Sequence, residues 1–246
     1  MKAKSELHSA DVSETIVPPA PAPPSTALTP AVEDYLKAIY TLQQHGSRVS
    51  TTALCAQLGG LKPGSVSGML RQLEERGLVI HQLYHGARLT PAGERAALEL
   101  VRNHRLLETF LVEVLGYSWD EVHAEAEALE HHISPRLTAR IAAYLGEPAL
   151  DPHGDPIPRC DGSLPHVSDQ RLSELAPGEP AEILRVLAQG DGQLRYLAAL
   201  GLVPGAAVQL TARAPFDGPL QLVVGGTTQI LDSQLAQQIV VGNQKD

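Results

Sequence analysis

The sequence predicts an α+β protein of several domains: an N-terminal winged helix-turn-helix, a central helical domain and a small C-terminal β-barrel. Three observations predict this order. Residues 29–92 contain three short helical patterns followed by two short apolar strands, the layout of a winged helix. Residues 93–150 contain longer stretches with helical spacing. After a Pro- and Gly-rich linker at 151–168, residues 169–246 contain short apolar runs separated by turn residues, as in a small barrel.

Composition limits the classes of protein that the chain can belong to. The 246 residues carry a net charge of −9, but basic residues dominate 46–90 and acidic residues dominate 101–132, which leaves a nucleic-acid partner open. No apolar run of about 18 residues is present, so we expect no membrane span. The N-terminus lacks an apolar leader, and the two cysteines form no CxxC pair. We therefore expect a cytoplasmic protein.

The N-terminal elements follow from caps and breaks. Residues 1–28 end in a proline-dense run and predict a disordered tail. A threonine and a proline then start a helix that ends near Gly46. A second short helix is predicted over 50–58. A third starts at 63–65 and ends at Gly77, with its apolar residues on one face.

Two apolar strands, 78–80 and 87–89, flank a polar tip at 84–86 and complete the predicted wing. The third helix exposes small polar side chains that can approach phosphates, and longer ones that can reach base edges. A winged helix used only for dimerisation or protein binding is the alternative, but the order of cap, glycine break, recognition helix and hairpin favours DNA binding. The predicted DNA-contacting residues are Ser50, Thr51, Lys62, Pro63, Ser65, Ser67, Gly68, Arg71, Gln72 and Arg88.

The central and C-terminal elements are predicted in the same way. Helices are expected over 90–115, 119–133 and 135–145. Beyond the linker the sequence is typical of an all-β domain, with short apolar runs bounded by turn residues. The predicted strands lie at 181–187, 206–214, 219–226, 227–232 and 237–241.

A group of histidines and glutamates is the most informative feature of the central domain. His123, Glu127, Glu130 and His131 fall on one stripe of the predicted helix 119–133. His104 and Glu108 repeat this chemistry on the preceding helix. A solvated acidic face is the alternative, but so many carboxylates with few Lys or Arg are unfavourable without a cation. Oxygen and nitrogen ligands without thiolates favour Mn(II) or Fe(II).

Catalytic motifs are not found. The Glu-x-x-His pairs of di-iron carboxylate proteins and the HExxH motif of metalloproteases are both absent. No nucleophile and base arrangement or phosphate loop stands out, so we expect that the protein is not an enzyme.

Several runs together resemble the diphtheria-toxin-repressor family. They are EDYLKAIYTL at 33–42, LVRNHRLLETFL at 100–111, EVHAEAEALEHHIS at 121–134 and DPHGDPIP at 151–158, besides the winged helix. The resemblance covers nearly everything after residue 28. It implies a dimeric, metal-activated transcription regulator with a winged helix, a helical dimerisation domain and an SH3-like (ferrous-transport-A-like) domain.

The resemblance also implies two metal sites. The iron-type members have methionine and cysteine where this chain has Asp34 and Glu127, whereas the manganese transport regulators have Asp and Glu there. Carboxylates favour a hard cation, so Mn(II) is expected, with Fe(II) as the rival. The implied ligands are Asp34, Glu127, Glu130 and His131 for the primary site, and His104, Glu108, His123 and Gln193 for the ancillary site.

Two departures from the family pattern concern these sites. Lys37 stands where the manganese-type members carry a glutamate ligand, which argues against their paired-manganese geometry. His104 could then serve the ancillary site, the primary site or a bridge. The ancillary glutamate of the longer members falls at Gly190, and Asp191 could substitute for it.

Three hypotheses of function result. The first is a homodimeric repressor of metal-uptake genes that Mn(II) or Fe(II) activates and that binds a palindromic double-stranded DNA operator. The second is a winged-helix regulator that responds to a small organic ligand and has no regulatory metal. The third is a metal-buffering or oxidase bundle with a degenerate winged helix.

Overall fold

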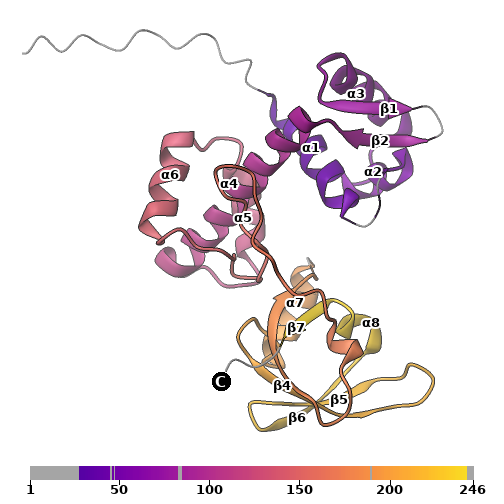
Figure 1. The fold of residues 1–246 in the computed structure, drawn as a ribbon, viewed down its shortest axis with the longest axis vertical. Coiled ribbons are helices and arrows are strands. Elements are labelled where there is room, and N and C mark those ends of the chain that lie inside the picture. The colour runs from indigo at the N-terminus through magenta and orange to yellow at the C-terminus, as the bar shows by residue number, and fades with distance from the viewer. Residues whose placement is uncertain (1–27, 45, 47, 83–84, 189, 243–246) are drawn as a thin grey trace, which may run out of the picture.

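The computed structural model describes residues 28–44, 46, 48–82, 85–188 and 190–242, and it forms a winged helix, a helical domain and a small β-barrel (Figure 1). The predicted α+β class and the order of its domains are confirmed. The predicted tail lies outside the described residues except for Leu28, and so does Tyr84 of the predicted wing tip. Among the described residues, no helix is long and apolar enough to cross a membrane.

The winged helix comprises α1 (Pro30–Gln43), α2 (Thr51–Gln57), α3 (Pro63–Glu75), β1 (Val79–Gln82) and β2 (Gly86–Leu89). Proline at the first turn starts α1 and α3, and the Ser50 hydroxyl caps α2 by accepting from the Ala53 amide at 3.1 Å. The two strands pair antiparallel as the wing. The core of this domain also takes buried residues from the following helix, including Ala97 and Val101.

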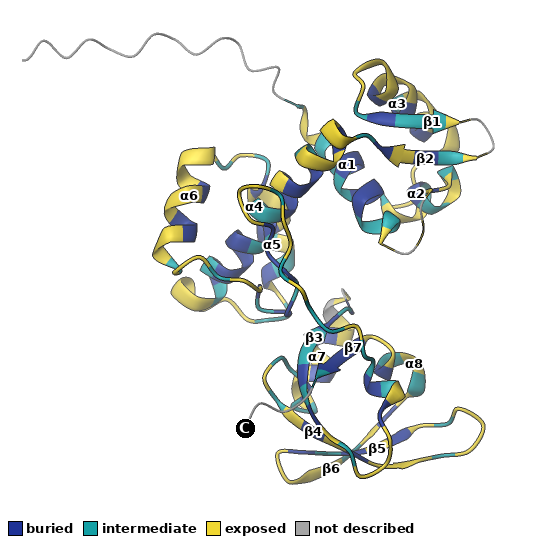
Figure 2. Cartoon of the chain, viewed as in Figure 1, coloured by how far each residue is buried: buried dark blue, intermediate teal, exposed yellow. Residues whose placement is uncertain are grey.

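The helical domain contains α4 (Pro91–Leu115), α5 (Val122–Leu129) and α6 (Pro135–Tyr144). The first half of α4 packs in the winged-helix core and its second half packs against α5 and α6, so one continuous helix joins both domains (Figure 1). Most of the surface of α6 is exposed (Figure 2).

The helix predicted over 119–133 is shorter than expected at both ends. Its first residues form a turn, and its last, Glu130 and His131, follow α5 as a cap and a turn. Pro135 disfavours helical backbone only at Ser134, which is extended and caps α6, so it separates α6 from α5 but does not account for the end of α5 at Leu129. Glu130 and His131 therefore reach their positions from a turn.

The C-terminal domain is built on a five-stranded antiparallel sheet in the order β6-β5-β4-β3-β7. All five predicted strands are confirmed. The all-β prediction missed α7, where Leu194 and Leu197 turn a helical face into the barrel core. The elements are η1 (Leu172–Glu174), β3 (Pro180–Val186), α7 (Asp191–Ala199), β4 (Ala207–Arg213), β5 (Leu220–Val224), β6 (Thr227–Leu231), α8 (Ser233–Ala236) and β7 (Ile239–Gly242).

The first part of the predicted linker, 151–158, is a packed turn. Leu150 pairs with Pro156, and Ile157 is buried in the helical core. Asp151 is buried and accepts from the backbone amides of His153 at 2.8 Å and Asp155 at 2.9 Å. The prolines restrict the backbone of this segment, and Gly154 at positive φ permits its turn. The segment is therefore a fixed turn.

Candidate metal centre

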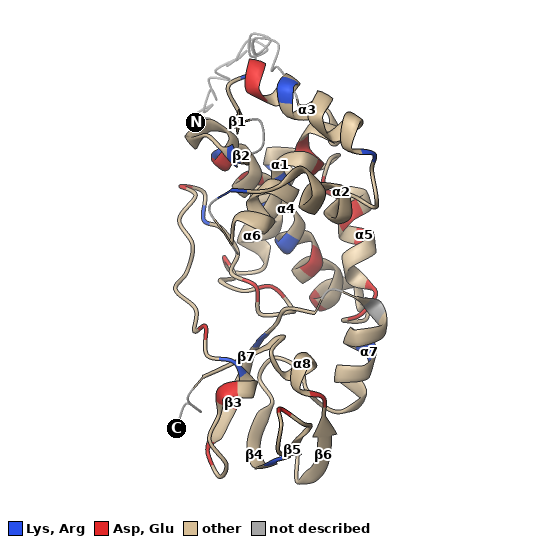
Figure 3. Cartoon of the chain, turned by 90° about the vertical axis from the view of Figure 1, so that its right-hand side faces the viewer, with Lys and Arg blue, Asp and Glu red and all other residues tan. Residues whose placement is uncertain are grey.

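Ligand-type side chains from α1, α4 and the end of α5 converge where the winged helix meets the helical domain. Acidic residues gather on and beside α5 (Figure 3). In the described part of the chain, four groups of His, Asp and Glu offer ligand atoms that lie within 4.8 Å of one another. Three of these groups include a residue of α4, so α4 supports most of the centre.

The first group joins Asp34 of α1 with Glu130 and His131 after α5. His131 Nε2 lies 2.9 Å from Asp34 Oδ1 and 3.7 Å from Glu130 Oε1. The side chain of Glu130 is fully buried, whereas that of Asp34 is 44% exposed. Three of the four predicted primary ligands therefore come together across the junction between the two domains.

Glu33 supports this group, and the sequence patterns did not identify it. Its Oε2 lies 2.6 Å from His131 Nδ1, which directs the opposite ring nitrogen toward Asp34 and Glu130. A carboxylate that holds the far nitrogen of a ligating histidine fixes the orientation of the ring and raises its basicity. The pattern that could have revealed Glu33 is its place beside Asp34 at the start of a helix that carries a ligand.

The fourth predicted primary ligand, Glu127, belongs to a second group with His104 and Glu130. Here Lys37 of α1 lies among the candidate ligands. Its Nζ donates to Glu127 Oε1 at 2.7 Å and to the Glu130 oxygens at 2.9 and 3.0 Å. The single four-residue site expected from the sequence is thus divided into two adjoining groups that share Glu130.

The third group is the predicted ancillary cluster of His104, Glu108 and His123. Glu108 Oε1 lies 2.9 Å from His104 Nε2 and 3.1 Å from His123 Nδ1. The other ring nitrogen of His104, Nδ1, faces Glu130 Oε2 at 2.5 Å. Of the roles left open for His104, the bridging position between the two sites is the one that its ring occupies.

Gln193 does not join this cluster. It is exposed on α7, whereas its neighbour Leu194 lines the pocket around His104 and Glu108. Gln193 is not among the residues that line this pocket. The side chain of Asp191, the alternative ligand, lies outside what the structure describes.

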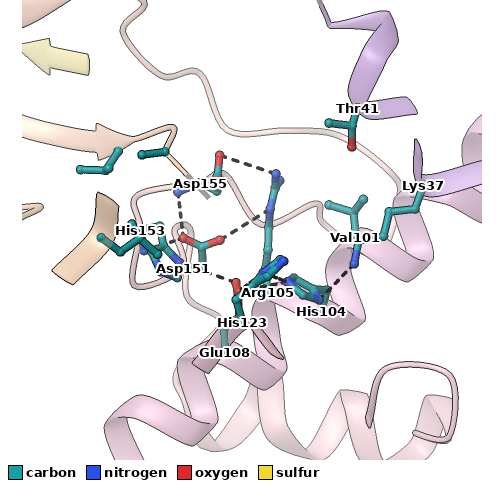
Figure 4. A pocket seen from close by; sticks show the side chains of 13 residues that line it. Lys37, Thr41, Val101, His104, Arg105, Glu108, His123, Asp151, His153 and Asp155 are labelled. Carbon is teal, nitrogen blue, oxygen red and sulfur yellow. Dashed lines mark hydrogen bonds and ion pairs between the residues drawn. The ribbon is translucent and has the colours of Figure 1, made fainter. Parts of the chain in front are cut away.

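A fourth group, Glu108, Asp151 and His153, is buried beside the ancillary cluster and was missed because 151–158 was interpreted as a linker (Figure 4). His153 Nδ1 lies 3.9 Å from Glu108 Oε2, so the two Glu108 oxygens face different groups. Arg105 of α4 adds an ion pair to Asp151 at 3.6 Å. The sequence pattern that could have revealed this group is an aspartate and a histidine two residues apart in a proline-rich turn.

The buried charges of the centre influence one another. Burial disfavours the imidazolium of His104, but the Glu108 carboxylate and hydrogen bonds to Glu108 and Glu130 outweigh it and raise the pKa of His104 to about 9. Burial likewise opposes ionisation of Glu108, yet His104 and His123 bring the pKa of Glu108 far below its usual range. Burial raises the pKa of Asp34 despite the nearby His131.

These donor sets fit a divalent cation. Every group consists of carboxylate oxygens and imidazole nitrogens, the ligands suited to Mn(II), Fe(II) and Zn(II). The most buried members, Glu130 and Glu108, are charged side chains that are almost never fully buried unless they are paired. Neither cysteine belongs to a described group.

The predicted DNA-contacting residues lie on the solvent-exposed surface of the winged helix. All are exposed except Thr51, which is half-buried at the start of α2. On α3, Ser65, Ser67 and Arg71 face solvent, while Val66, Leu70 and Leu73 form the buried face, as the apolar pattern predicts. A helix with this polar face and an adjoining hairpin has the shape that enters a major groove.

A winged helix joined through one helix to a domain with clustered ligands defines a metal-responsive DNA-binding protein. Comparison with known families gives the same class. Residues 27–87 match the iron dependent repressor N-terminal DNA binding domain, 90–159 match the iron dependent repressor metal binding and dimerisation domain, and 170–242 match the FeoA domain.

Individual relatives match over most of their length. The iron-dependent repressor IdeR of Mycobacterium tuberculosis is 33% identical over 226 residues, covering 87% of this chain and 97% of that protein. The diphtheria toxin repressor of Corynebacterium jeikeium is 28% identical over 208 residues, covering 75% and 86%. A solved manganese-dependent transcriptional repressor in complex with manganese is 43% identical, with a TM-score of 0.79, covering 87% of this chain and all of that one.

The chain belongs to the iron-dependent repressor family, which includes the diphtheria toxin repressors, and the resemblance predicted from its motifs is confirmed. Its members are metal-dependent, DNA-binding transcriptional repressors.

Proposed function

We propose that this protein is a Mn(II)-activated homodimeric repressor that binds a palindromic operator of metal-uptake genes. The observation that carries the proposal is the convergence of Asp34, from the winged helix, with Glu130 and His131, from the helical domain. Ligands contributed by both domains make the position of one relative to the other depend on a shared cation. Fe(II) is the competing ion, because both metals accept oxygen and nitrogen ligands.

The preference for manganese rests on ligand chemistry. Thiolate and thioether ligands favour softer ions, and the described ligand groups contain only carboxylates and imidazoles. Asp34 occupies a position at which the resemblance places a sulfur ligand in iron-type members. Relatives named for iron and for manganese both occur among the similar proteins, so their names leave the choice of metal open.

The chain's own residues suggest how DNA binding depends on the site. A bound cation would neutralise the carboxylates of Asp34 and Glu130, which otherwise repel each other. Glu33 holds His131 in the orientation that directs its Nε2 into the group. Because α1 and α3 pack in the same core, fixing α1 against the end of α5 also fixes α3 relative to the helical domain.

The geometry of a DNA-bound dimer explains why holding α3 in one position would increase the affinity for DNA. A symmetric dimer reads two half-sites separated by about one DNA turn or a multiple of it. Two α3 helices held at that spacing pay less conformational cost on binding than helices that sample many positions. Metal would therefore raise DNA affinity by selecting an arrangement that the metal-free dimer visits less often.

The experiment is a DNA-binding titration of the full chain on an operator selected from random duplexes. Affinity is measured with Mn(II), Fe(II), Zn(II) and a chelator at constant ionic strength, because salt alone changes such affinities strongly. We expect the tightest binding with Mn(II) and weak binding with the chelator. Equal affinity in all conditions would refute metal activation, and the tightest binding with Fe(II) would assign the site to iron.

A further inference from the structure

Among the residues that the structure describes, Lys37 is the one lysine that pairs with candidate ligands of the metal centre. Its side chain is only 18% exposed, and it leaves α1 toward the end of α5. The acidic residues nearest to it in sequence, Glu33 and Asp34, have His131 as their ion-pair partner instead. Lys37 therefore joins the winged helix to the helical domain directly, beside the ligands that a metal would join.

The ammonium of Lys37 has the coordination of a bound cation. Its Nζ faces Glu127 Oε1 at 2.7 Å and the two Glu130 oxygens at 2.9 and 3.0 Å, which match the three N–H donors of an ammonium. It also lies 3.2 Å from His104 Nδ1. The carboxylate acceptors belong to Glu127 and Glu130, which together with His104 form a group of candidate metal ligands.

A metal ion and this ammonium cannot share the position. A divalent ion bonded to the same oxygens and nitrogen at about 2.0–2.2 Å would lie within the volume of the Lys37 ammonium. A protonated lysine has no lone pair, so it cannot become a ligand. The adjoining group shares Glu130, whose two oxygens Lys37 contacts, but its other members, Asp34 and His131, pair with each other at 2.9 Å and offer a separate position for an ion.

Resting on the proposed function, we propose that Lys37 takes the second cation position of the primary centre, so that this centre binds a single divalent ion. That ion would bind at Asp34, Glu130 and His131, while Lys37 keeps Glu127 neutralised and shares Glu130 with the ion. Lys37 is thus a residue that determines how many metal ions the centre holds.

The test counts Mn(II) ions in the full chain carrying Glu108→Gln, because Glu108 belongs to both groups outside the primary centre. In this background we expect one Mn(II) per chain, with the electron paramagnetic resonance spectrum of an isolated ion. Adding Lys37→Glu should raise the count to two and give the spectrum of a magnetically coupled pair. The matched control Lys37→Arg keeps the positive charge and should leave the count at one.

Two ions in the Glu108→Gln chain that retains Lys37 would overturn the proposal. A single ion in the chain that carries both Glu108→Gln and Lys37→Glu would also overturn it. If the variants fail to fold, anomalous scattering from crystals of the unmodified chain grown with Mn(II) decides the question. We expect a peak between Asp34, Glu130 and His131, with Lys37 still paired with Glu127. A peak bonded to Glu127 and His104 Nδ1 would contradict it.

Failure of this proposal is distinguishable from failure of the proposed function. If the count is one but Mn(II) leaves DNA affinity unchanged, the proposed function fails and the position of Lys37 stands. If DNA affinity depends on Mn(II) but the centre binds two ions in the presence of Lys37, only the role of Lys37 is wrong.

Discussion

The two glutamates paired with Lys37 differ in burial, and this difference predicts different costs for the same chemical change. The Glu130 side chain is fully buried and also faces His104 Nδ1, whereas the Glu127 side chain is 46% exposed. Replacing Glu130 by glutamine leaves two positively charged groups facing a neutral amide. Breaking a buried ion pair in this way costs about 3 kcal/mol or more. Glu127→Gln breaks an exposed pair and should cost less than about 1 kcal/mol.

The assay is urea unfolding of the metal-free protein in the presence of a chelator. Trp119, the only tryptophan, donates to the Pro152 carbonyl at 2.9 Å between the helical domain and the barrel, so its fluorescence follows this region. We expect the transition of Glu130→Gln to move to a clearly lower urea concentration, with an unchanged slope. The transition of Glu127→Gln should remain close to that of the unmodified chain. Equal losses for the two variants would refute the argument from burial.

Three further predictions follow from the site and the winged helix. The pKa of His104, raised from 6.5 to about 9, means that its charged form stabilises the metal-free fold fully below about pH 6.5. This contribution, on the order of 3 kcal/mol, should be lost as pH rises through about 9, and unfolding of His104→Gln should lack this dependence. Glu33→Gln should weaken Mn(II) binding by about 10- to 100-fold, measured by calorimetry, because His131 loses the carboxylate that orients it; unchanged affinity would remove Glu33 from the site. Arg71→Ala should weaken operator binding by about 1–3 kcal/mol if Arg71 reads a base, and should lower the salt dependence if it contacts a phosphate. No change in either quantity would exclude Arg71 from the interface.

Much of the fold could be predicted because its determinants are local. The prolines at 30 and 63 start α1 and α3, and the apolar spacing along α3 identifies its buried face. Turn residues between short apolar runs separate the strands of the barrel. The ligand pairs on α4 and α5 were also visible, because residues four apart share a helix face.

The errors arose where long-range packing decides the structure. Local spacing predicted a helix over 119–133, whereas α5 ends at Leu129 and residues 130–132 form a turn. The proline content of 151–158 indicated a linker, yet Asp151 and His153 are buried because α4 and the barrel pack against this turn. His131 is 98 residues from Glu33 and Glu127 is 90 residues from Lys37, so helical spacing alone could not assign these partners.

The central claim is that a cation shared between α1 and the end of α5 controls DNA binding. The most direct measurement is fluorescence anisotropy on operator DNA for the full chain and for Asp34→Ala, each with Mn(II) and with a chelator. Asp34 is the only one of its group that the winged helix contributes. We expect Mn(II) to increase the affinity of the unmodified chain by a factor of about 5 to 150, the usual range of allosteric coupling, and to leave Asp34→Ala unchanged. A full Mn(II) response in Asp34→Ala, or none in the unmodified chain, would contradict the claim.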